Sequence, residues 1–438
     1  MKQFVTLFLL ALLLTPAAMP LTVHVEAEEE VYQFTNPNNG SGPMWSHGNT
    51  GIALLNGTPW VSQMETGEGV PPLCNTRWRL LERTENGWQM RAESETFNQR
   101  EPCPLAAANG ALFLSVNDST QPLGTQYGEC LPHVLRFTPD GDGLVKTALL
   151  PQWTEKHYFT DHSYRGYAAD PEAGRLLLLN IDAKTSVQHA CILSESGETR
   201  AVGSVSFPVR ACYPHVSLRG NAAHVLAVGD IVEPVKEWRE YKFAQTGQNW
   251  DYVFRILYYT ATPDLAAAPF CVPVEIANVD GTAGAVSGHD LWIAPDGAAH
   301  ILYTERKTAS ALMRDKFFPG NSILNRLMLA VVRDGAVVSR RVLVEGAENA
   351  EPGAARFHVA ADGAVFALLH MSGGDGGAKV MRVFPSEEDA APVSVPLLEP
   401  LSSFSLAGVR AGNPPSDTIH AIGPIGNSMR YARLTLER

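Results

Sequence analysis

Apolar and polar residues alternate in two short runs on either side of Asp296 and Gly297. The stretch GHDLWIAPDGAAHILYTER, residues 288–306, contains both runs. Alternation with a period of two predicts a strand with one buried and one exposed face. An Asp-Gly pair between two such strands is typical of a tight hairpin turn. This stretch therefore predicts a β-hairpin.

The same hairpin pattern recurs along the chain. Each copy has one strand-like run, a turn that contains Asn-Gly, Asp-Gly, Ala-Gly or Arg-Gly, and a second run rich in Leu, Val and Ile. The seven copies begin at Met44, Arg100, His162, Arg210, Gly288, Gly353 and Ser402. Two more strand-like runs follow nearly every copy, and repeats of four antiparallel strands predict the blades of a β-propeller.

The two ends of the chain complete the seventh repeat. The run VYQF at residues 31–34 precedes the first copy, whereas the last copy is followed by one clear strand, MRYARLTLER. If the N-terminal strand forms the outer edge of the last blade, the ring closes without an open sheet edge. We therefore predict a single all-β, seven-bladed propeller with four antiparallel strands per blade over residues 29–438. A six-bladed ring, a two-domain arrangement or a pair of β-sandwiches fits seven in-phase hairpins less well.

The first residues predict export. MKQFVTLFLLALLLTPAA has one lysine, an apolar run that is short for a membrane span, and small residues near its end. This pattern is typical of a cleaved secretory signal, which we assign to residues 1–28, with a mature chain that begins between Met19 and Val31. An uncleaved anchor is the alternative. We expect a secreted or periplasmic monomer with no membrane contact after cleavage.

Export also permits disulfide bonds, and the chain has six cysteines. Their spacing contains no Cys-x-x-Cys pair, so a zinc cluster of cysteines has little support. Cys191 and Cys212 fall on neighbouring predicted strands and are the best candidates for a bridge.

Long connections predict a binding face. In a propeller the innermost strands begin on one face, here termed the upper face, which also holds the second-to-third and blade-to-blade connections. The long connections all belong to this face and comprise residues 66–75, 119–133, 151–161, 231–250 and 307–322. The turns expected on the opposite, lower face are short. Long loops in compact domains are mostly functional, although solvated charged loops are the alternative interpretation.

The upper-face loops carry aromatic and cationic side chains on a protein whose net charge is −12. That charge argues against a nucleic-acid partner. Aromatic rings stack on sugar rings and cations attract carboxylate or sulfate, so we expect this rim to bind an acidic oligo- or polysaccharide. The rim residues predicted to bind it are Trp153, Trp238, Arg239, Tyr241 and Trp250.

The first residues of the inner strands point toward the propeller axis and are rich in Arg, His and Tyr. Cleavage of a uronate-containing chain by β-elimination needs such a set. An arginine neutralises the carboxylate, a His or Tyr removes the weakly acidic proton beside it, and a second such group protonates the leaving oxygen. The predicted catalytic residues are His47, His162, Tyr164, Arg165, Arg210, Tyr213 and His289. The predicted substrate contacts in the funnel are Trp45, Arg100 and Arg356.

Other reactions have weaker support. The candidates for hydrolysis by two carboxylates are Glu101 and Asp290, with Asp161 as a third that can approach, and they come from distant blades. A sialidase also uses an arginine cluster with a tyrosine nucleophile, but the repeated Ser-x-Asp-x-Gly-x-x-Trp box is absent. The chain also lacks a Gly-x-Ser-x-Gly elbow, a P-loop and a His-Glu-x-x-His helix.

The repeats resemble a known family. DHSYRGYAADPEAGRLLLLN and GHDLWIAPDGAAHILYTER are similar to the repeat of BNR-type (sialidase-like) propellers, which include ulvan lyases and enzymes that cleave rhamnose-glucuronate linkages. The resemblance implies a seven-bladed propeller that acts on acidic, rhamnose-containing polysaccharide through His, Tyr and Arg at the funnel. His47, in WSHGN, resembles the N-terminal histidine of the rhamnosidase-like members. The lyases' spacing of two histidines followed by a tyrosine and an arginine is not reproduced.

The resemblance implies no required cofactor and is compatible with a structural calcium or zinc ion. Our preferred prediction is a polysaccharide lyase or a related glycosidase. A non-catalytic propeller that binds glycan or protein is the first alternative, and a sialidase-like hydrolase is the second.

Overall fold

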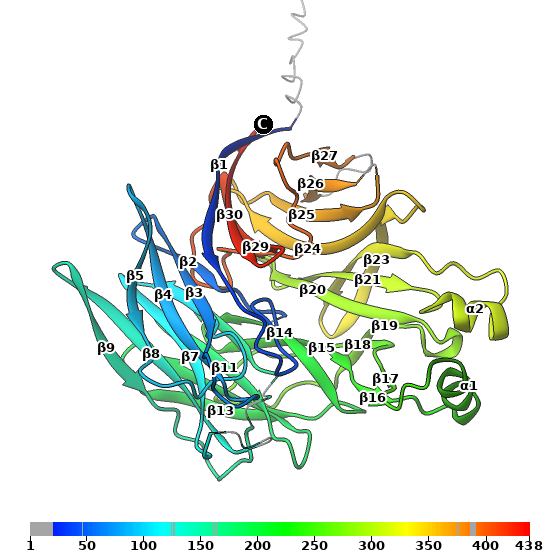
Figure 1. The fold of residues 1–438 in the computed structure, drawn as a ribbon, viewed down its shortest axis with the longest axis horizontal. Coiled ribbons are helices and arrows are strands. Elements are labelled where there is room, and N and C mark those ends of the chain that lie inside the picture. Colours follow the sequence, from blue (N-terminus) through cyan, green and yellow to red (C-terminus); the bar gives the residue numbers. More distant parts are fainter. Residues whose placement is uncertain are drawn as a thin grey trace, which may run out of the picture.

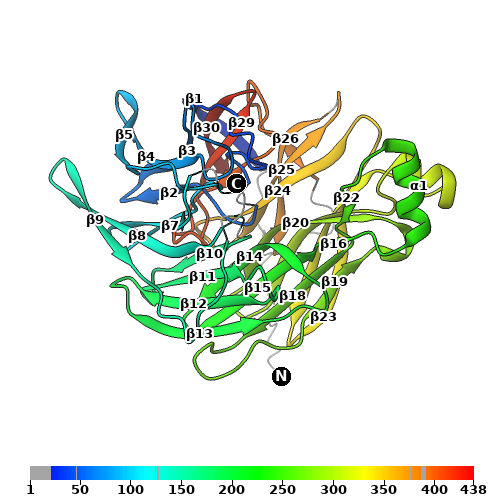
Figure 2. The ribbon, with the colours of Figure 1, turned by 60° about the horizontal axis from the view of Figure 1, so that its bottom comes forward.

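Seven four-stranded antiparallel sheets surround a central axis in the computed structural model (Figures 1 and 2). The structure describes residues 21–438 except 46, 124, 126–127, 161, 163, 375 and 386–390. The first strands of successive blades contact one another in a ring that closes between the last blade and the first. The predicted seven-bladed propeller is therefore confirmed.

The first three blades are each built from four consecutive strands. Blade 1 comprises β2 (Ile52–Leu55), β3 (Thr58–Thr66), β4 (Thr76–Thr84) and β5 (Gly87–Glu93). Blade 2 comprises β6 (Leu105–Ala108), β7 (Ala111–Ser119), β8 (Cys130–Asp140) and β9 (Gly143–Leu149). Blade 3 comprises β10 (Gly166–Asp170), β11 (Arg175–Ile181), β12 (Gln188–Ser194) and β13 (Thr199–Val205).

The next three blades follow the same order with additions. Blade 4 comprises β14 (Ala211–Arg219), β15 (Ala222–Gly229), β18 (Ile256–Thr262) and β19 (Val274–Asn278). Blade 5 comprises β20 (Ala285–Ile293), β21 (Ala299–Arg306), β22 (Asn325–Arg333) and β23 (Ala336–Glu345), and a 3-10 turn, η1 (Asp280–Thr282), precedes it. Blade 6 comprises β24 (Glu351–Val359), β25 (Val365–Ser372), β26 (Gly377–Phe384) and β27 (Val393–Ser394).

Two helical insertions stand at the edge of blades 4 and 5. The first inserts between β15 and β18 and comprises β16 (Ile231–Val232), α1 (Lys236–Thr246) and β17 (Tyr252–Val253). The second, between β21 and β22, contains α2 (Ala311–Phe317). The two helices contact each other and project from the ring at the right of Figure 1. Among the described residues, no helix is long and apolar enough to cross a membrane.

The last blade is closed by the N-terminal strand, as predicted. It comprises β28 (Ser405–Leu406), β29 (Thr418–Ile425), β30 (Ser428–Glu437) and β1 (Thr22–Gln33). The strand β1 pairs antiparallel with β30 from Thr22 opposite Glu437 to Gln33 opposite Ser428. The strands β1 and β30, from opposite ends of the described chain, therefore lie side by side (Figure 1).

The position of β1 bears on the predicted signal peptide. Residues 1–20 of that segment lie outside the described residues, but β1 begins at Thr22, inside the predicted 1–28 segment. Cleavage after residue 28 would remove the first half of the strand that closes the ring. If the predicted signal is cleaved, we therefore expect the mature chain to begin no later than Thr22, which N-terminal sequencing or intact-mass measurement checks. A mature chain that begins at residue 29 would contradict this expectation.

The described residues form seven hydrophobic clusters, one at each interface between adjacent blades. Second strands such as β7 are buried on both faces because a neighbouring blade covers each side, whereas outer strands such as β9 are largely exposed. The cluster between blades 7 and 1 contains Val31 of β1 beside Ile52 and Tyr431. The N-terminal strand thus supplies core as well as hydrogen bonds.

The predicted bridge between Cys191 and Cys212 is wrong, because both thiols are free. Cys191 of β12 packs in the cluster between blades 2 and 3, whereas Cys212 of β14 packs between blades 4 and 5. The two side chains therefore face different blade interfaces. Alternation within a strand shows that a cysteine is buried but does not show which neighbouring blade covers it.

The expectation that long connections occupy only the upper face is also wrong. Residues 263–273 and 407–417 connect strands on the lower face. The second of these connections, between β28 and β29, enters the central channel, where the backbone N–H of Ala169 donates to Arg410 O (2.8 Å) and that of Ala107 donates to Ala411 O (2.9 Å). The Arg410 side chain donates to the carbonyls of Val216 (3.0 Å) and Gly48 (2.9 Å). This loop, here termed the plug, ties several blades together from below.

Gly412 of the plug has a left-handed backbone, with φ of 82°, and a Cβ there would lie 2.0 Å from the carbonyl oxygen of Ala107. We expect Gly412→Ala to lower the free energy of unfolding by about 2–4 kcal/mol, since it adds a backbone clash to left-handed strain. Gly57→Ala is the matched control, because Gly57 has φ of 84° and open space around it. Urea unfolding followed by circular dichroism compares the two, and equal losses would contradict the close packing of the plug.

Candidate functional site

A cavity of about 660 Å³ opens on the upper face above blades 4 to 6. Its walls come from the beginnings of β20 and β24, the bulge of β14, the end of β21 and the loop that precedes β2. The polar and aromatic residues of its lining are His47, Tyr213, Phe254, Ser287, His289, Thr304, Arg306, Asn325, Arg356, Ser402 and Ser403. The structure therefore brings four of the predicted funnel residues, His47, Tyr213, His289 and Arg356, into one cavity.

β-Bulges aim the inner strands of blades 4, 5 and 6 at this cavity. The pairing register shifts between Cys212 and His215 in β14, between Gly288 and Asp290 in β20, and between Pro352 and Ala355 in β24. Such an extra residue bends a strand and re-aims its side chain. Tyr213 and His289 are extra residues of this kind, which explains why they project into the cavity.

Three site residues adopt a backbone conformation that is rare for residues with a side chain. His47, Tyr164 and Tyr213 have φ of 43°, 44° and 52°. Left-handed conformations of this kind cost roughly 1–3 kcal/mol each and cluster at functional sites, where the surrounding structure enforces them. Three residues with this conformation therefore lie around one mouth of the ring.

Aromatic rings surround Tyr213. Its ring centroid lies 3.9 Å from that of His47, 5.0 Å from that of Tyr164 and 5.9 Å from that of Trp45. His47 Nε2 and Trp45 Nε1 are buried and have no hydrogen-bond partner among the described residues. Buried polar atoms are nearly always hydrogen-bonded, so these two atoms are available to a ligand or to water.

The histidines of the cavity are neutral at pH 7. Burial, together with the positive charge of Arg356, lowers the pKa of His47 to about 4, although the negative charge of Glu101 opposes the shift. Burial and Arg356 likewise lower the pKa of His289 to about 3. The Nε2 atom of His289 lies 3.0 Å from Thr304 Oγ1. Neutral imidazole with an unpartnered nitrogen can accept a proton, which gives His47 the chemistry of a general base.

Arg356 orients both histidines. Its guanidinium donates to the backbone carbonyl of His47 (3.0 Å) and to that of His289. Burial lowers the pKa of Arg356 to about 10, so it stays cationic at neutral pH. Arg356, which the sequence predicts as a substrate contact, lines the cavity, and its guanidinium donors hold the two histidine backbones.

The tyrosines remain protonated. Burial raises the pKa of Tyr164 to about 12 and also raises the pKa of Tyr213. The Arg210 guanidinium lies 5.1 Å from the centre of the Tyr164 ring and forms an ion pair with the buried Asp230. A phenol that keeps its proton at neutral pH can donate it to a leaving group.

His162 is held at the edge of the site by a buried carboxylate. His162 Nδ1 lies 2.6 Å from Glu101 Oε1, and the His162 ring stacks on Trp45 at 6.0 Å. Burial opposes ionisation of Glu101, but the contact with His162 and the charges of Arg165 and Arg100 outweigh it and keep the pKa of Glu101 below its ordinary value. Glu101 thus orients His162.

Two of the predicted arginines, Arg165 and Arg100, donate hydrogen bonds to buried backbone carbonyls. Arg165 is buried and donates to the carbonyls of Pro102 (2.7 Å) and Ser115 (3.2 Å). Arg100 is buried and donates from Nε to Asn39 O (3.0 Å). Both residues hold backbone segments of the first blades, and neither lines the cavity described above.

The predicted rim residues separate into two groups. Trp153 is half-buried against the cluster between blades 2 and 3. The other four, Trp238, Arg239, Tyr241 and Trp250, lie in the insertion between β15 and β18. Trp238 and Tyr241 pack against Phe317 of α2, whereas Trp250 is 76% exposed and stacks on Tyr252 with centroids 4.6 Å apart. Only Trp250 therefore presents a broad free ring.

Several cavity residues were missed at the sequence level. Thr304 and Arg306 lie at the end of β21 and Asn325 begins β22, so second and third strands also reach the upper face. Arg306 is hydrogen-bonded to Asn325 Oδ1 (3.2 Å) and paired with Glu351 (3.0 Å). The repeat itself could have identified these positions, because every second strand ends beside the mouth.

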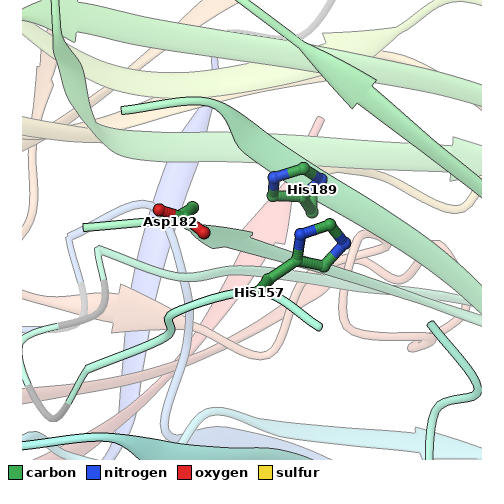
Figure 3. A group of neighbouring side chains, drawn as sticks. All are labelled: His157, Asp182 and His189. Atoms are coloured by element: carbon green, nitrogen blue, oxygen red, sulfur yellow. The ribbon is translucent and has the colours of Figure 1, made fainter. Parts of the chain in front are cut away.

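One group of side chains among the described residues has the composition of a metal site. It consists of His157, Asp182 and His189 in blade 3, whose potential ligand atoms all lie within 4.8 Å of one another (Figure 3). None of the three lines the cavity.

The comparison with known proteins shows similarity in fold. No protein-family model matches the chain, and no curated protein matches its sequence. A solved polysaccharide lyase, a PL25 ulvan lyase bound to -[GlcA(1-4)Rha3S]-, superposes with a TM-score of 0.54 at 10% identity, over 93% of this chain and 94% of that chain. A second PL25 ulvan lyase structure gives a TM-score of 0.53 at 10% identity, over 88% and 91% of the two chains.

A weaker similarity, with a TM-score of 0.46 at 9% identity, relates the chain to an α-L-arabinanase of Penicillium chrysogenum complexed with arabinobiose, over 94% and 98% of the two chains. At these identities the ulvan lyase structures support the propeller fold. The chain is a seven-bladed propeller structurally similar to PL25 ulvan lyase.

Proposed function

We propose that the protein is a carbohydrate-active enzyme that binds acidic polysaccharide in the upper-face cavity and cleaves it by β-elimination. The observation that carries the proposal is the meeting of a neutral histidine, His47, and a protonated tyrosine, Tyr213, with ring centroids 3.9 Å apart in a cavity that also holds arginine. These are the groups that elimination requires.

His47 is the proposed base and Tyr213 the proposed acid. His47 Nε2 removes the proton on the carbon beside the uronate carboxylate, and the electrons of that C–H bond form a carbon–carbon double bond. The glycosidic C–O bond breaks, and the Tyr213 hydroxyl protonates the leaving oxygen. The proton on His47 then returns through water to the Tyr213 phenolate, so both groups are restored.

Neutralisation of the uronate carboxylate falls to a partly exposed arginine. Arg306 lines the cavity with 30% of its side chain exposed, and Arg210 beside Tyr164 has 34% exposed. Arginine binds carboxylate through two parallel N–H donors and lowers the cost of the negative charge that develops. Arg356 is instead a positioning residue, since its donors hold the His47 and His289 backbones.

Hydrolytic alternatives find less support at this site. Glu101 contacts His162, while Asp290 pairs with Arg410 of the plug and accepts from the Phe357 N–H (2.8 Å). Neither carboxylate is available as half of a hydrolytic pair. A sialidase-like mechanism needs an activated tyrosine, but burial raises the pKa of Tyr213 and favours the neutral phenol.

The fold likeness supports the same class of substrate. The similar PL25 ulvan lyase is bound to a glucuronate-rhamnose sulfate oligosaccharide, and structural neighbours of this chain include lyases and glycosidases. We propose on this basis that the chain is a distant member of the BNR-type propellers. Its location, secreted or periplasmic, is part of the same proposal.

Digestion of a panel of acidic glycans tests the proposal. We expect incubation with ulvan, or with a gum rich in rhamnose and glucuronate, to produce the ultraviolet absorbance of an unsaturated uronate together with shorter chains. Tyr213→Phe, which keeps the ring and removes the hydroxyl, is expected to lose both signals. Shorter chains without new absorbance would contradict elimination in favour of hydrolysis. Binding without shorter chains would contradict it in favour of a non-catalytic propeller.

A further inference from the structure

Three side chains of blade 3 converge outside the cavity. His157 lies in the connection between β9 and β10, Asp182 directly follows β11, and His189 is the second residue of β12. Their potential ligand atoms are within 4.8 Å of one another, and Figure 3 shows the two imidazole rings beside the carboxylate. We propose that these three residues hold a divalent transition-metal ion, with Zn²⁺ as the preferred ion.

The carboxylate of Asp182 is fixed and charged. Its Oδ2 accepts from the N–H of Tyr158 (2.8 Å), and its Oδ1 accepts from the N–H groups of Lys184 (2.8 Å) and Thr185 (3.0 Å). Although burial opposes ionisation, these backbone hydrogen bonds keep the pKa of Asp182 below its ordinary value. A carboxylate oxygen with one donor retains a free lone pair, so Oδ2 can also bind a cation.

The two histidines present ligand nitrogens without other partners. Their rings stack with centroids 3.5 Å apart and an interplanar angle of 20°. Neither ring nitrogen of His157 or His189 has a hydrogen-bond partner among the described residues. Burial and the adjacent His157 lower the pKa of His189, which favours the neutral imidazole that metal ions bind.

The donor set selects the class of ion. Two imidazole nitrogens and one carboxylate oxygen suit Zn²⁺ and related late first-row ions, whereas Ca²⁺ and Mg²⁺ prefer oxygen ligands alone. Calcium, which the sequence left open, is therefore not the ion for this group. The fourth position would be open to water.

A metal ion here would fasten the connection that leads into the funnel. His157 packs against Trp153 and Phe159, with centroids 5.9 and 5.5 Å away, and the same connection continues to His162 and Tyr164. The ion would tie this connection to β11 and β12, and since its ligands do not line the cavity, its role is structural. The site does not depend on the proposed elimination, because it rests on a separate group of residues.

Titration of the metal-free full-length protein tests the site. We expect Zn²⁺ to bind one to one by calorimetry and Co²⁺ to give saturable visible bands of tetrahedral intensity, whereas Ca²⁺ and Mg²⁺ give no saturable signal. His157→Ala and His189→Ala are each expected to weaken Zn²⁺ binding by about 100-fold or more. His24→Ala is the matched control, since His24 also contacts a carboxylate, Glu437 (2.8 Å), and does not belong to the group of His157, Asp182 and His189.

Thermal unfolding supplies a readout that does not involve activity. Zn²⁺ is expected to raise the Tm of the wild-type protein and of His24→Ala by at least about 2 °C, and to leave that of His157→Ala unchanged. Equal Tm shifts in all variants, or Zn²⁺ affinity that both substitutions leave intact, would overturn the proposal. If a variant does not fold, the wild-type Co²⁺ titration decides, and the absence of a saturable one-to-one spectrum overturns the site.

Discussion

Replacing His47 with asparagine is expected to lower kcat/KM for the cleaved polysaccharide by about 10²- to 10⁴-fold, the range that general bases contribute. Asparagine is the appropriate substitution because it tolerates the left-handed backbone that His47 adopts, with φ of 43°, but cannot take up the proton. We expect kcat to carry the loss and the dissociation constant to change little. Steady-state rates and a direct binding measurement separate the two.

The control for this prediction is His24→Asn, which changes an exposed histidine of β1 that does not line the cavity. Activity in His47→Asn above about a tenth of the wild-type value would contradict the assignment of the base, since a general base contributes more than that. Loss of binding in proportion to loss of rate would assign His47 to substrate recognition instead.

The pH dependence of the same reaction gives an independent check. A base acts only when it is unprotonated, so activity is lost as the pH falls through its pKa. Because burial lowers the pKa of His47 to about 4, we expect kcat/KM to stay level through pH 6 and 5 and to fall only near pH 4. A fall in kcat/KM centred near the ordinary histidine pKa of about 6.5 would point to a different base. Initial rates measured directly after a jump from pH 7 give this acid-side fall in kcat/KM. Tryptophan fluorescence is the control for folding.

The architecture could be predicted because it repeats. Period-two alternation and turn residues mark each hairpin without any long-range information, and the unpaired strands at the two ends indicate closure. The plug could not be predicted in this way. The run from Ala407 to Asp417 looks like a long hairpin turn, and its entry into the channel depends on carbonyls of Gly48 and Val216 that come from other blades.

The candidate site was predicted in composition but not in detail. Position near the start of an inner strand selected His47, Tyr213 and His289, which line the cavity. The same rule also selected Arg165, whose side chain turns inward to the carbonyls of Pro102 and Ser115. A bulge shifts the phase of alternation by one residue, and the sequence does not reveal where a bulge falls.

The propeller is expected to lose stability steeply between pH 6.5 and 5, before most of its carboxylates titrate. Four buried or half-buried histidines of the first and second strands share one property. Burial lowers the pKa to about 4 in His224, His300, His358 and His420. In the unfolded chain each returns to about 6.5. The unfolded state therefore binds more protons between these values, and stability that is complete above pH 6.5 falls as the pH drops toward 4.

Each of these histidines can contribute a slope of up to about 1.4 kcal/mol per pH unit, so together they rival the whole stability of an ordinary domain. Urea unfolding at a series of pH values measures the slope. His358→Gln removes one titrating group while keeping a donor for Ser416 O, which lies 2.6 Å from His358 Nε2. We expect this variant to be slightly less stable at pH 7 and to lose less stability on acidification.

The matched control is His24→Gln, which replaces a histidine whose side chain is 51% exposed and should leave the slope unchanged. A slope in His358→Gln equal to that of the wild type would show that His358 takes up its proton in the folded state. The argument then extends to the site itself, because the cavity histidines His47 and His289 are kept neutral by the same burial. Burial of histidines thus has two effects: it makes the folded protein sensitive to acid, and it keeps the proposed base, His47, unprotonated at neutral pH.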